Sequence, residues 1–186
     1  KETSLRVIIV GANPHLSKTW YEAAWDKDAE PSAPDCYSLD GIRPSTDSAK
    51  PQSDLCASCG QNVWGSKMTA QGQKIKACAD KKRLAVVASE APDGPIYLLE
   101  VTPAALKNFF AYHKELSVRG IPAEIVVTEV SFDTDASFPK LKFSFHDFIS
   151  EESQSIVDGL FGTREVTEIT GEAPQQAIVM EIAKPT

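Results

Sequence analysis

All four cysteines of this 186-residue chain lie in one segment, residues 36–83. The segment is rich in Ser, Pro, Gly, Gln and Asp and poor in aliphatic side chains, so it buries too little apolar surface to order itself. A segment of this kind needs a cross-link, such as disulfides or a structural metal, in order to fold. The cysteines that can provide it are Cys36, Cys56, Cys59 and Cys78.

The spacing of the cysteines, C-x19-C-x2-C-x18-C, favours a structural zinc site. Cys56 and Cys59 lie one tight turn apart, so two thiolates can point at one ion, and the outer pair can complete a tetrahedron. Four thiolates favour Zn²⁺, with an iron–sulfur cluster or two disulfides as alternatives. A thioredoxin-like redox pair is disfavoured because Cys56 does not lie between a predicted strand and a predicted helix.

Charge is distributed unevenly along the chain. The formal net charge is −7, which by itself argues against a polyanionic partner. Residues 64–83, however, contain six basic side chains and a single acid, Asp80, and so have a local net charge of +5. The basic residues are Lys67, Lys74, Lys76, Lys81, Lys82 and Arg83. A local field of this kind attracts polyanions even to an acidic protein, whereas a solvated lysine face is the alternative.

Large aromatic residues are concentrated in the same aliphatic-poor third of the chain. We predict that some of them are exposed platforms on which nucleic-acid bases stack while the lysines contact phosphates. The candidate platforms are Trp64, Tyr37, Trp20 and Trp25. The alternative is that these rings pack the cysteine-rich segment onto the rest of the protein.

The remaining sequence predicts a mainly β, α+β fold with two helices. Five strands are expected at residues 5–10, 84–88, 96–101, 125–132 and 141–149, and helices are expected to begin after Thr102 and Ser150. This order fits an OB-like five-stranded barrel with a four-cysteine zinc-binding subdomain inserted between its first two strands. An α+β sandwich is the alternative. The expected parts are residues 1–35, 36–83, 84–170 and a tail, 171–186.

The sequence contains no recognisable catalytic set, so we do not predict an enzyme. The loop that follows the first strand lacks the glycine that a phosphate loop places directly before its lysine, here Lys18, and Pro14 removes an amide. A closed four-cysteine site leaves no open position for a substrate. No membrane span and no secretory signal are visible, which predicts a cytoplasmic protein whose thiols stay reduced.

The chain contains five distinctive sequence motifs: VGANPHLSKTWYE, PDCYSLDGIRPS, PQSDLCASCGQNVWGSK, KACADKKRLAVV and VSFDTDASFPKLKF. Together they span most of residues 7–145, and they resemble a family of phage-encoded single-stranded-DNA-binding proteins. The resemblance implies a chain that extends upstream of Leu5. A looser architectural analogy is the zinc-containing helix-destabilising protein of large tailed phages, whose ligands include a histidine that this chain lacks beside its cysteines.

The expected function is therefore sequence-independent binding of single-stranded DNA in phage replication or recombination, with zinc as a structural cofactor. The resemblance implies the cytoplasm of a bacterial host as the location, and phage or host replication proteins as further partners. The alternative is a zinc-containing phage protein that binds a host protein such as RNA polymerase. The net charge of −9 beyond residue 83 suits a basic partner. An iron–sulfur nuclease or redox protein is a third reading.

Overall fold

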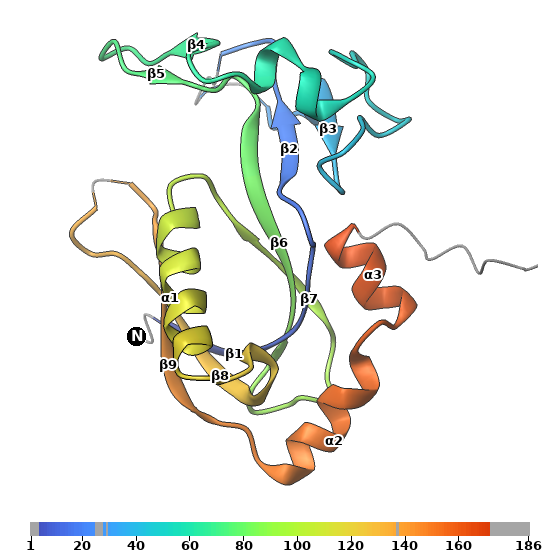
Figure 1. Ribbon diagram of the computed structural model, residues 1–186, viewed down its shortest axis with the longest axis vertical. Coiled ribbons are helices and arrows are strands. Elements are labelled where there is room, and N and C mark those ends of the chain that lie inside the picture. The colour runs from blue at the N-terminus through green and yellow to red at the C-terminus, as the bar shows by residue number, and fades with distance from the viewer. Residues whose placement is uncertain (1–3, 25–27, 29, 137, 172–186) are drawn as a thin grey trace, which may run out of the picture.

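The computed structural model describes residues 4–24, 28, 30–136 and 138–171. Its centre is an antiparallel sheet in the order β9–β8–β1–β6–β7 (Figure 1). The strands are β1 Ser4–Ala12, β6 Ala79–Ala88, β7 Tyr97–Val101, β8 Val126–Phe132 and β9 Leu141–Phe148. All five predicted strands are thus confirmed, although β6 begins earlier than expected and a short 3-10 turn, Ala123–Ile125, precedes β8.

Strand β6 joins the central sheet to the cysteine-rich segment. Its second half pairs with β1, while its first half pairs with β2 (Ser17–Trp20), where Ser17 lies opposite Lys81. Strand β2 in turn pairs with β3 (Cys36–Ser38). We call residues 36–78 the cysteine module. Because β6 begins directly after Cys78 and continues through the sheet, the module is anchored to a core strand (Figure 1).

Three helices occur in the described residues, where the sequence predicts two: α1 Leu106–Val118, α2 Glu151–Leu160 and α3 Arg164–Thr170. Ser150 caps α2 as predicted, because its side chain accepts from the Ser153 amide. Thr102 does not cap α1. Its carbonyl instead closes a turn that delays the helix to Leu106. Helix α3, which the sequence prediction misses, has a hydroxyl cap at Thr163.

Helices cover both faces of the sheet (Figure 1). On one face, Phe109 of α1 packs into a core cluster with strand residues such as Val7 and Leu84. On the other, Val157 of α2 and Val166 of α3 pack into a cluster with residues that include Ile8 and Ala85. Residues 7–10 and 84–87 are buried without a break, and consecutive burial is the pattern of a strand that is covered on both sides.

The predicted closed barrel is wrong. No pairing joins β7 to β9 in the part of the chain that the structure describes, so the sheet has two free edges. The apolar runs in β1 and β6 are unbroken, so both faces of these strands must be buried. Helices therefore pack on both sides of the sheet, and the sheet stays open. The architecture is a mixed α/β fold built on a mostly antiparallel sheet.

Gly11 lets α3 approach the sheet closely. A methyl group at this position would lie 2.4 Å from Cγ1 of Val166, whose side chain is buried. We expect Gly11→Ala to lower the free energy of unfolding by about 1–3 kcal/mol through overpacking. Gly159→Ala is the matched control, because a methyl group there meets nothing within 4 Å and alanine favours a helix. Urea denaturation measures both, and equal loss in both variants would contradict the close contact.

Candidate metal centre and nucleic-acid interface

The fold brings the four cysteines to one cavity. Cys36 lies in β3, Cys56 begins the 3-10 turn Cys56–Ser58, Cys59 lies between that turn and the next one (Gly60–Asn62), and Cys78 directly precedes β6. All four line a cavity of about 10 Å³, the space that roughly one water-sized body occupies. Each is only 7–9% exposed, and all four are free thiols.

Backbone hydrogen bonds hold the C-x2-C turn in place. The Cys59 amide donates to the Cys56 carbonyl at 3.4 Å, and the Cys56 amide donates to the Ile42 carbonyl at 2.9 Å. The Cys78 amide donates to the Gln61 carbonyl at 2.8 Å, which ties the last cysteine to the turn. The buried Trp20 ring packs against Cys36 and Cys78 and forms one wall of the cavity.

The four cysteines match a zinc ion in ligand type but are not arranged around one position. As their side chains lie, no group of three or more His, Cys, Asp or Glu among the described residues is placed to hold a metal. Four buried thiols at one small cavity nevertheless match a closed structural zinc site in ligand type and number. The chemistry of the residues therefore fits zinc.

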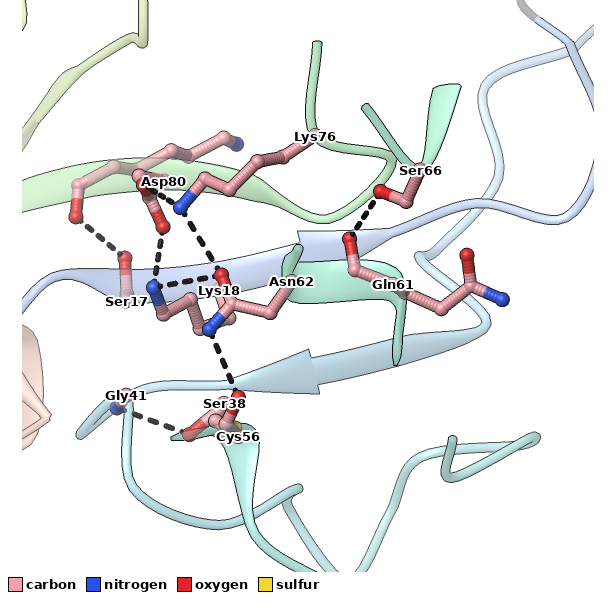
Figure 2. Close-up of polar contacts among 11 residues, drawn as sticks. Ser17, Lys18, Ser38, Gly41, Cys56, Gln61, Asn62, Ser66, Lys76 and Asp80 are labelled. Carbon is pink, nitrogen blue, oxygen red and sulfur yellow. Dashed lines mark hydrogen bonds and ion pairs between the residues drawn. The ribbon is translucent and has the colours of Figure 1, made fainter. Parts of the chain in front are cut away.

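A charged network borders the cavity (Figure 2). The Asp80 carboxylate accepts hydrogen bonds from the ammonium groups of both Lys18 and Lys76. The same two ammonium groups donate to Oδ1 of Asn62, at 3.3 Å and 3.0 Å. Nδ2 of Asn62 donates to the Cys56 carbonyl at 2.8 Å. Lys18 and Asn62 therefore line the cavity, and Asn62 connects Lys18 and the Lys76–Asp80 pair to the backbone of Cys56.

Burial opposes ionisation of the thiols. It raises the pKa of Cys78 to about 11, and it also raises the pKa of Cys56. The positive charge of Lys18 acts in the opposite direction on both thiols, and Lys18 lines the cavity itself. A metal ion would have to displace protons from these thiols, so we expect its affinity to increase with pH. No sequence pattern predicts Lys18 at the cysteines, because only the pairing of β2 with β6 places it there.

Three of the predicted nucleic-acid-binding residues share one exposed hairpin, which we define as residues 63–75. Its strands are β4 (Lys67–Met68) and β5 (Lys74–Ile75). The Trp64 side chain is 71% exposed, and Lys67 and Lys74 are exposed as well. Within the described residues, no carboxylate pairs with either lysine. The hairpin thus combines a free aromatic face with two free cations.

The other predicted residues lie elsewhere or are engaged. Lys76 is paired with Asp80, and Lys81 and Arg83 both contact Glu100, at 2.9 Å and 3.3 Å. The Lys82 ammonium donates to the carbonyl of Asn13. Trp20 is buried, Tyr37 is half-buried on β3, and Trp25 lies outside the described residues. Of the predicted set, the hairpin residues are therefore the ones best placed to meet a ligand.

The hairpin is attached directly to the cysteine turn. The Ser66 hydroxyl donates to the Gln61 carbonyl at 3.0 Å and accepts from the Ala77 amide at 2.9 Å, so it bridges the segments beside Cys59 and Cys78. The Gly65 amide donates to the Ile75 carbonyl at 3.1 Å, and Gly65 has a φ of 89° that favours glycine. Order around the cysteines therefore determines the orientation of Trp64.

Asp80 should stabilise the attachment of the module to β6. Its side chain is 16% exposed and faces Lys18 and Lys76. We expect Asp80→Asn to lower the free energy of unfolding by about 1–3 kcal/mol, because two ammonium groups lose their counter-charge. Lys50→Met is the control. Its pair with Glu22 is exposed, so the urea midpoint should hardly change. Equal midpoints for both variants would contradict this role of Asp80.

The Asp80 pairs also predict a pH dependence. Burial by itself would raise the pKa of Asp80, but the hydrogen bonds and charges of Lys18 and Lys76 outweigh it and lower the pKa. The contribution of Asp80 to stability is therefore fully present above about pH 3.9, the pKa of an unfolded aspartate, and is lost as pH falls through the lower folded pKa. Acid titration of the native chain and of Asp80→Asn should show this difference.

Comparison with known proteins adds no assignment. The chain matches no family model, no curated protein and no solved structure. None of the helices in the described ranges combines the length and the apolar character that crossing a bilayer requires.

Proposed function

We propose that this protein binds single-stranded DNA through the hairpin, and that one zinc ion held by the four cysteines orders the module that presents it. The observation that supports this most strongly is the combination of Trp64, which is 71% exposed, with Lys67 and Lys74 on the same hairpin. Bases stack on exposed rings with little regard to sequence, while lysines contact the phosphates. The proposed binding is accordingly independent of base sequence.

Zinc in this role contributes folding free energy and does no chemistry on a substrate. Cys36, Cys56, Cys59 and Cys78 would hold it, and their donor set leaves no position for a catalytic water. Four thiolates around Zn²⁺ carry a net charge of −2. The ammonium groups of Lys18 and Lys76, only partly balanced by Asp80, reduce the cost of burying that charge.

The strand order also supports a nucleic-acid-binding fold. β1 pairs with β6 and β8, β6 with β7, and β8 with β9, and helix α1 lies between the third and fourth of these strands in the chain. These are the neighbours expected in an OB-type Greek-key barrel, apart from the pair that would close it. The cysteine module occupies the connection between the first two strands, and in OB folds this loop contacts oligonucleotides. We propose that the sheet is an opened relative of that barrel.

Titration of the zinc-loaded full chain with a labelled single-stranded oligonucleotide at several salt concentrations tests the proposal. Two lysine–phosphate contacts predict that log affinity falls with log salt with a slope of about −1.4. Trp64→Ala should weaken binding by about 1–3 kcal/mol, which corresponds to roughly 5- to 150-fold. A salt-independent affinity, or an unchanged affinity in Trp64→Ala, would argue against the hairpin.

A protein-binding role is the second candidate, and apolar side chains on the hairpin favour it. Val63 and Met68 are 57% and 61% exposed beside Trp64. The resemblance described above makes a phage or host protein, such as a replication protein or RNA polymerase, the expected kind of partner. Affinity capture from a nuclease-treated host lysate separates the two roles. A partner that is retained without nucleic acid, and lost in Trp64→Ala, favours the protein-binding role.

A further inference from the structure

The two free edges of the central sheet differ in how they are protected. An unpaired edge strand is a template for pairing with another chain, and proteins block such edges with charges, bulges or covering groups. Edge strand β9 carries exposed charges at Lys142 and Asp147. Its register shifts at His146, an extra residue relative to β8, and its Leu141 carbonyl accepts from Nδ2 of Asn108 at 2.8 Å. This edge is therefore protected against further pairing.

The other edge strand, β7, lacks these features. Within the described residues it pairs with β6 alone, and that register runs without a shift. Its one charged side chain, Glu100, already contacts Lys81 and Arg83, at 2.9 Å and 3.3 Å. Tyr97 and Leu98 follow one another and so point to opposite faces of the sheet, where they are 54% and 43% exposed. The edge thus offers apolar side chains on both faces.

An apolar groove continues from this edge across the face of the sheet that carries α1. Its volume is about 540 Å³, and strands β1, β6, β7 and β8 contribute its lining. Tyr97 and Leu99 line it from β7, and its floor includes Val7, Val86 and Val130, which are at most 8% exposed. Continuous apolar surface of this kind marks an interaction site. A strand that pairs with β7 would cover the adjoining part of the groove.

The sequence of β7 is complementary to itself. A two-fold contact places a patch on the same patch of a second copy, so each position must suit the position it meets. In an antiparallel pair centred on Leu98, this residue faces its own copy, and Tyr97 of one chain faces Leu99 of the other. Glu100 then lies opposite Ile96 and not opposite its own copy. Both exposed side chains of the edge therefore meet apolar side chains, and no like charges face each other.

We propose that β7 pairs with β7 of a second copy of this chain, antiparallel about a two-fold axis at Leu98, so that two sheets join into one. Tyr97 of each copy covers the part of the groove that Leu99 of the other copy lines. The occupant of the edge is a second copy because the strand matches itself in polarity and in charge. This inference does not depend on DNA or zinc binding.

Sedimentation of the full chain over a concentration series tests the proposal. We expect a monomer–dimer equilibrium. Leu98→Lys should raise its dissociation constant by about tenfold or more, because two ammonium groups would lie directly opposite each other. Ser144→Lys is the matched control, since it places the same charge at an exposed position in the middle of β9 and should leave the equilibrium unchanged.

Charge pairing at the axis gives a sharper test. Leu98→Lys and Leu98→Glu should each be mainly monomeric, whereas an equimolar mixture of the two should dimerise again, because opposite charges then meet at the axis. The exposure of Leu98 makes both substitutions compatible with folding, and unchanged urea midpoints in dilute solution would verify it. In the native chain, amides of Tyr97–Val101 should exchange with solvent more slowly at concentrations where the dimer forms.

Four results would overturn the proposal. The first is a native chain that stays monomeric at every concentration. The second is a dimer that Leu98→Lys leaves intact or that Ser144→Lys abolishes, because the interface would then lie elsewhere. The third is a mixture of the two Leu98 variants that stays monomeric although both are folded. The fourth is exchange in β7 that does not depend on concentration.

Discussion

Cys59→Ser is expected to abolish zinc binding and to unfold the cysteine module, while the central sheet stays folded. In small zinc-dependent modules, binding of a structural zinc ion contributes about 10–16 kcal/mol to folding. Residues 36–78 have few buried apolar side chains to replace it, whereas the core clusters of the central sheet lie outside the module. Binding of single-stranded DNA should be lost together with the module, because Ser66 ties the hairpin to the cysteine turn.

Ala57→Ser is the matched control for this variant. It introduces the same hydroxyl into the same turn at an exposed position that is not a ligand. Zinc content, limited proteolysis of residues 36–78 and oligonucleotide affinity should all remain native in Ala57→Ser. If Cys59→Ser keeps a protease-resistant module and native affinity, the module does not depend on the metal, and the proposed role of zinc is wrong.

Lys67→Glu combined with Lys74→Glu is expected to remove most of the affinity for single-stranded DNA without unfolding the protein. At a log–log slope of about −0.7 for each phosphate contact, two contacts make the affinity roughly 25-fold higher in 0.1 M salt than in 1 M salt. The double variant loses this gain, and its two carboxylates repel the phosphates. The magnitude of the slope of log affinity against log salt should decrease by about 1.4. Neither lysine has an ion-pair partner among the described residues, so stability should change little.

Lys107→Glu combined with Lys114→Glu is the control for net charge. Both residues are exposed on α1, away from the cysteine module. This control should retain nearly native affinity and slope. Equal losses in the two double variants would show that overall charge, rather than the hairpin, governs binding. Lys76 is unsuitable for this test because its charge also stabilises the fold through Asp80.

The strands of the fold could be predicted from local pattern, but their closure could not. Apolar runs bounded by turn residues located all five strands of the central sheet, and a serine at position 150 located α2. The closed barrel was predicted from element order alone. The unbroken burial of residues 7–10 and 84–87 argues against it, because a strand of a small barrel exposes alternate residues. Helix α3 was missed because seven residues give too short a periodic signal.

The candidate site was predictable only in part. The cysteine spacing predicts a single centre, and the four thiols line one cavity, but as their side chains lie they form no group placed to hold a metal within the described residues. The pairing of Lys76 with Asp80, and of Lys81 and Arg83 with Glu100, was not foreseeable. These contacts depend on which strands lie side by side, and a charge count along the chain does not contain that information. The structure therefore reduces the candidate phosphate-contacting residues from the six basic side chains of residues 64–83 to Lys67 and Lys74 of the hairpin.

The metal content and thiol reactivity of the purified full chain test the role of the four cysteines most directly. Elemental analysis should find one zinc ion per chain, and all four thiols should stay unreactive toward a thiol reagent until a chelator removes the metal. A colourless preparation agrees with zinc and excludes an iron–sulfur cluster. A metal-free chain whose four thiols react at once, or a chain in which two or more thiols are lost to disulfides, would contradict the proposed centre.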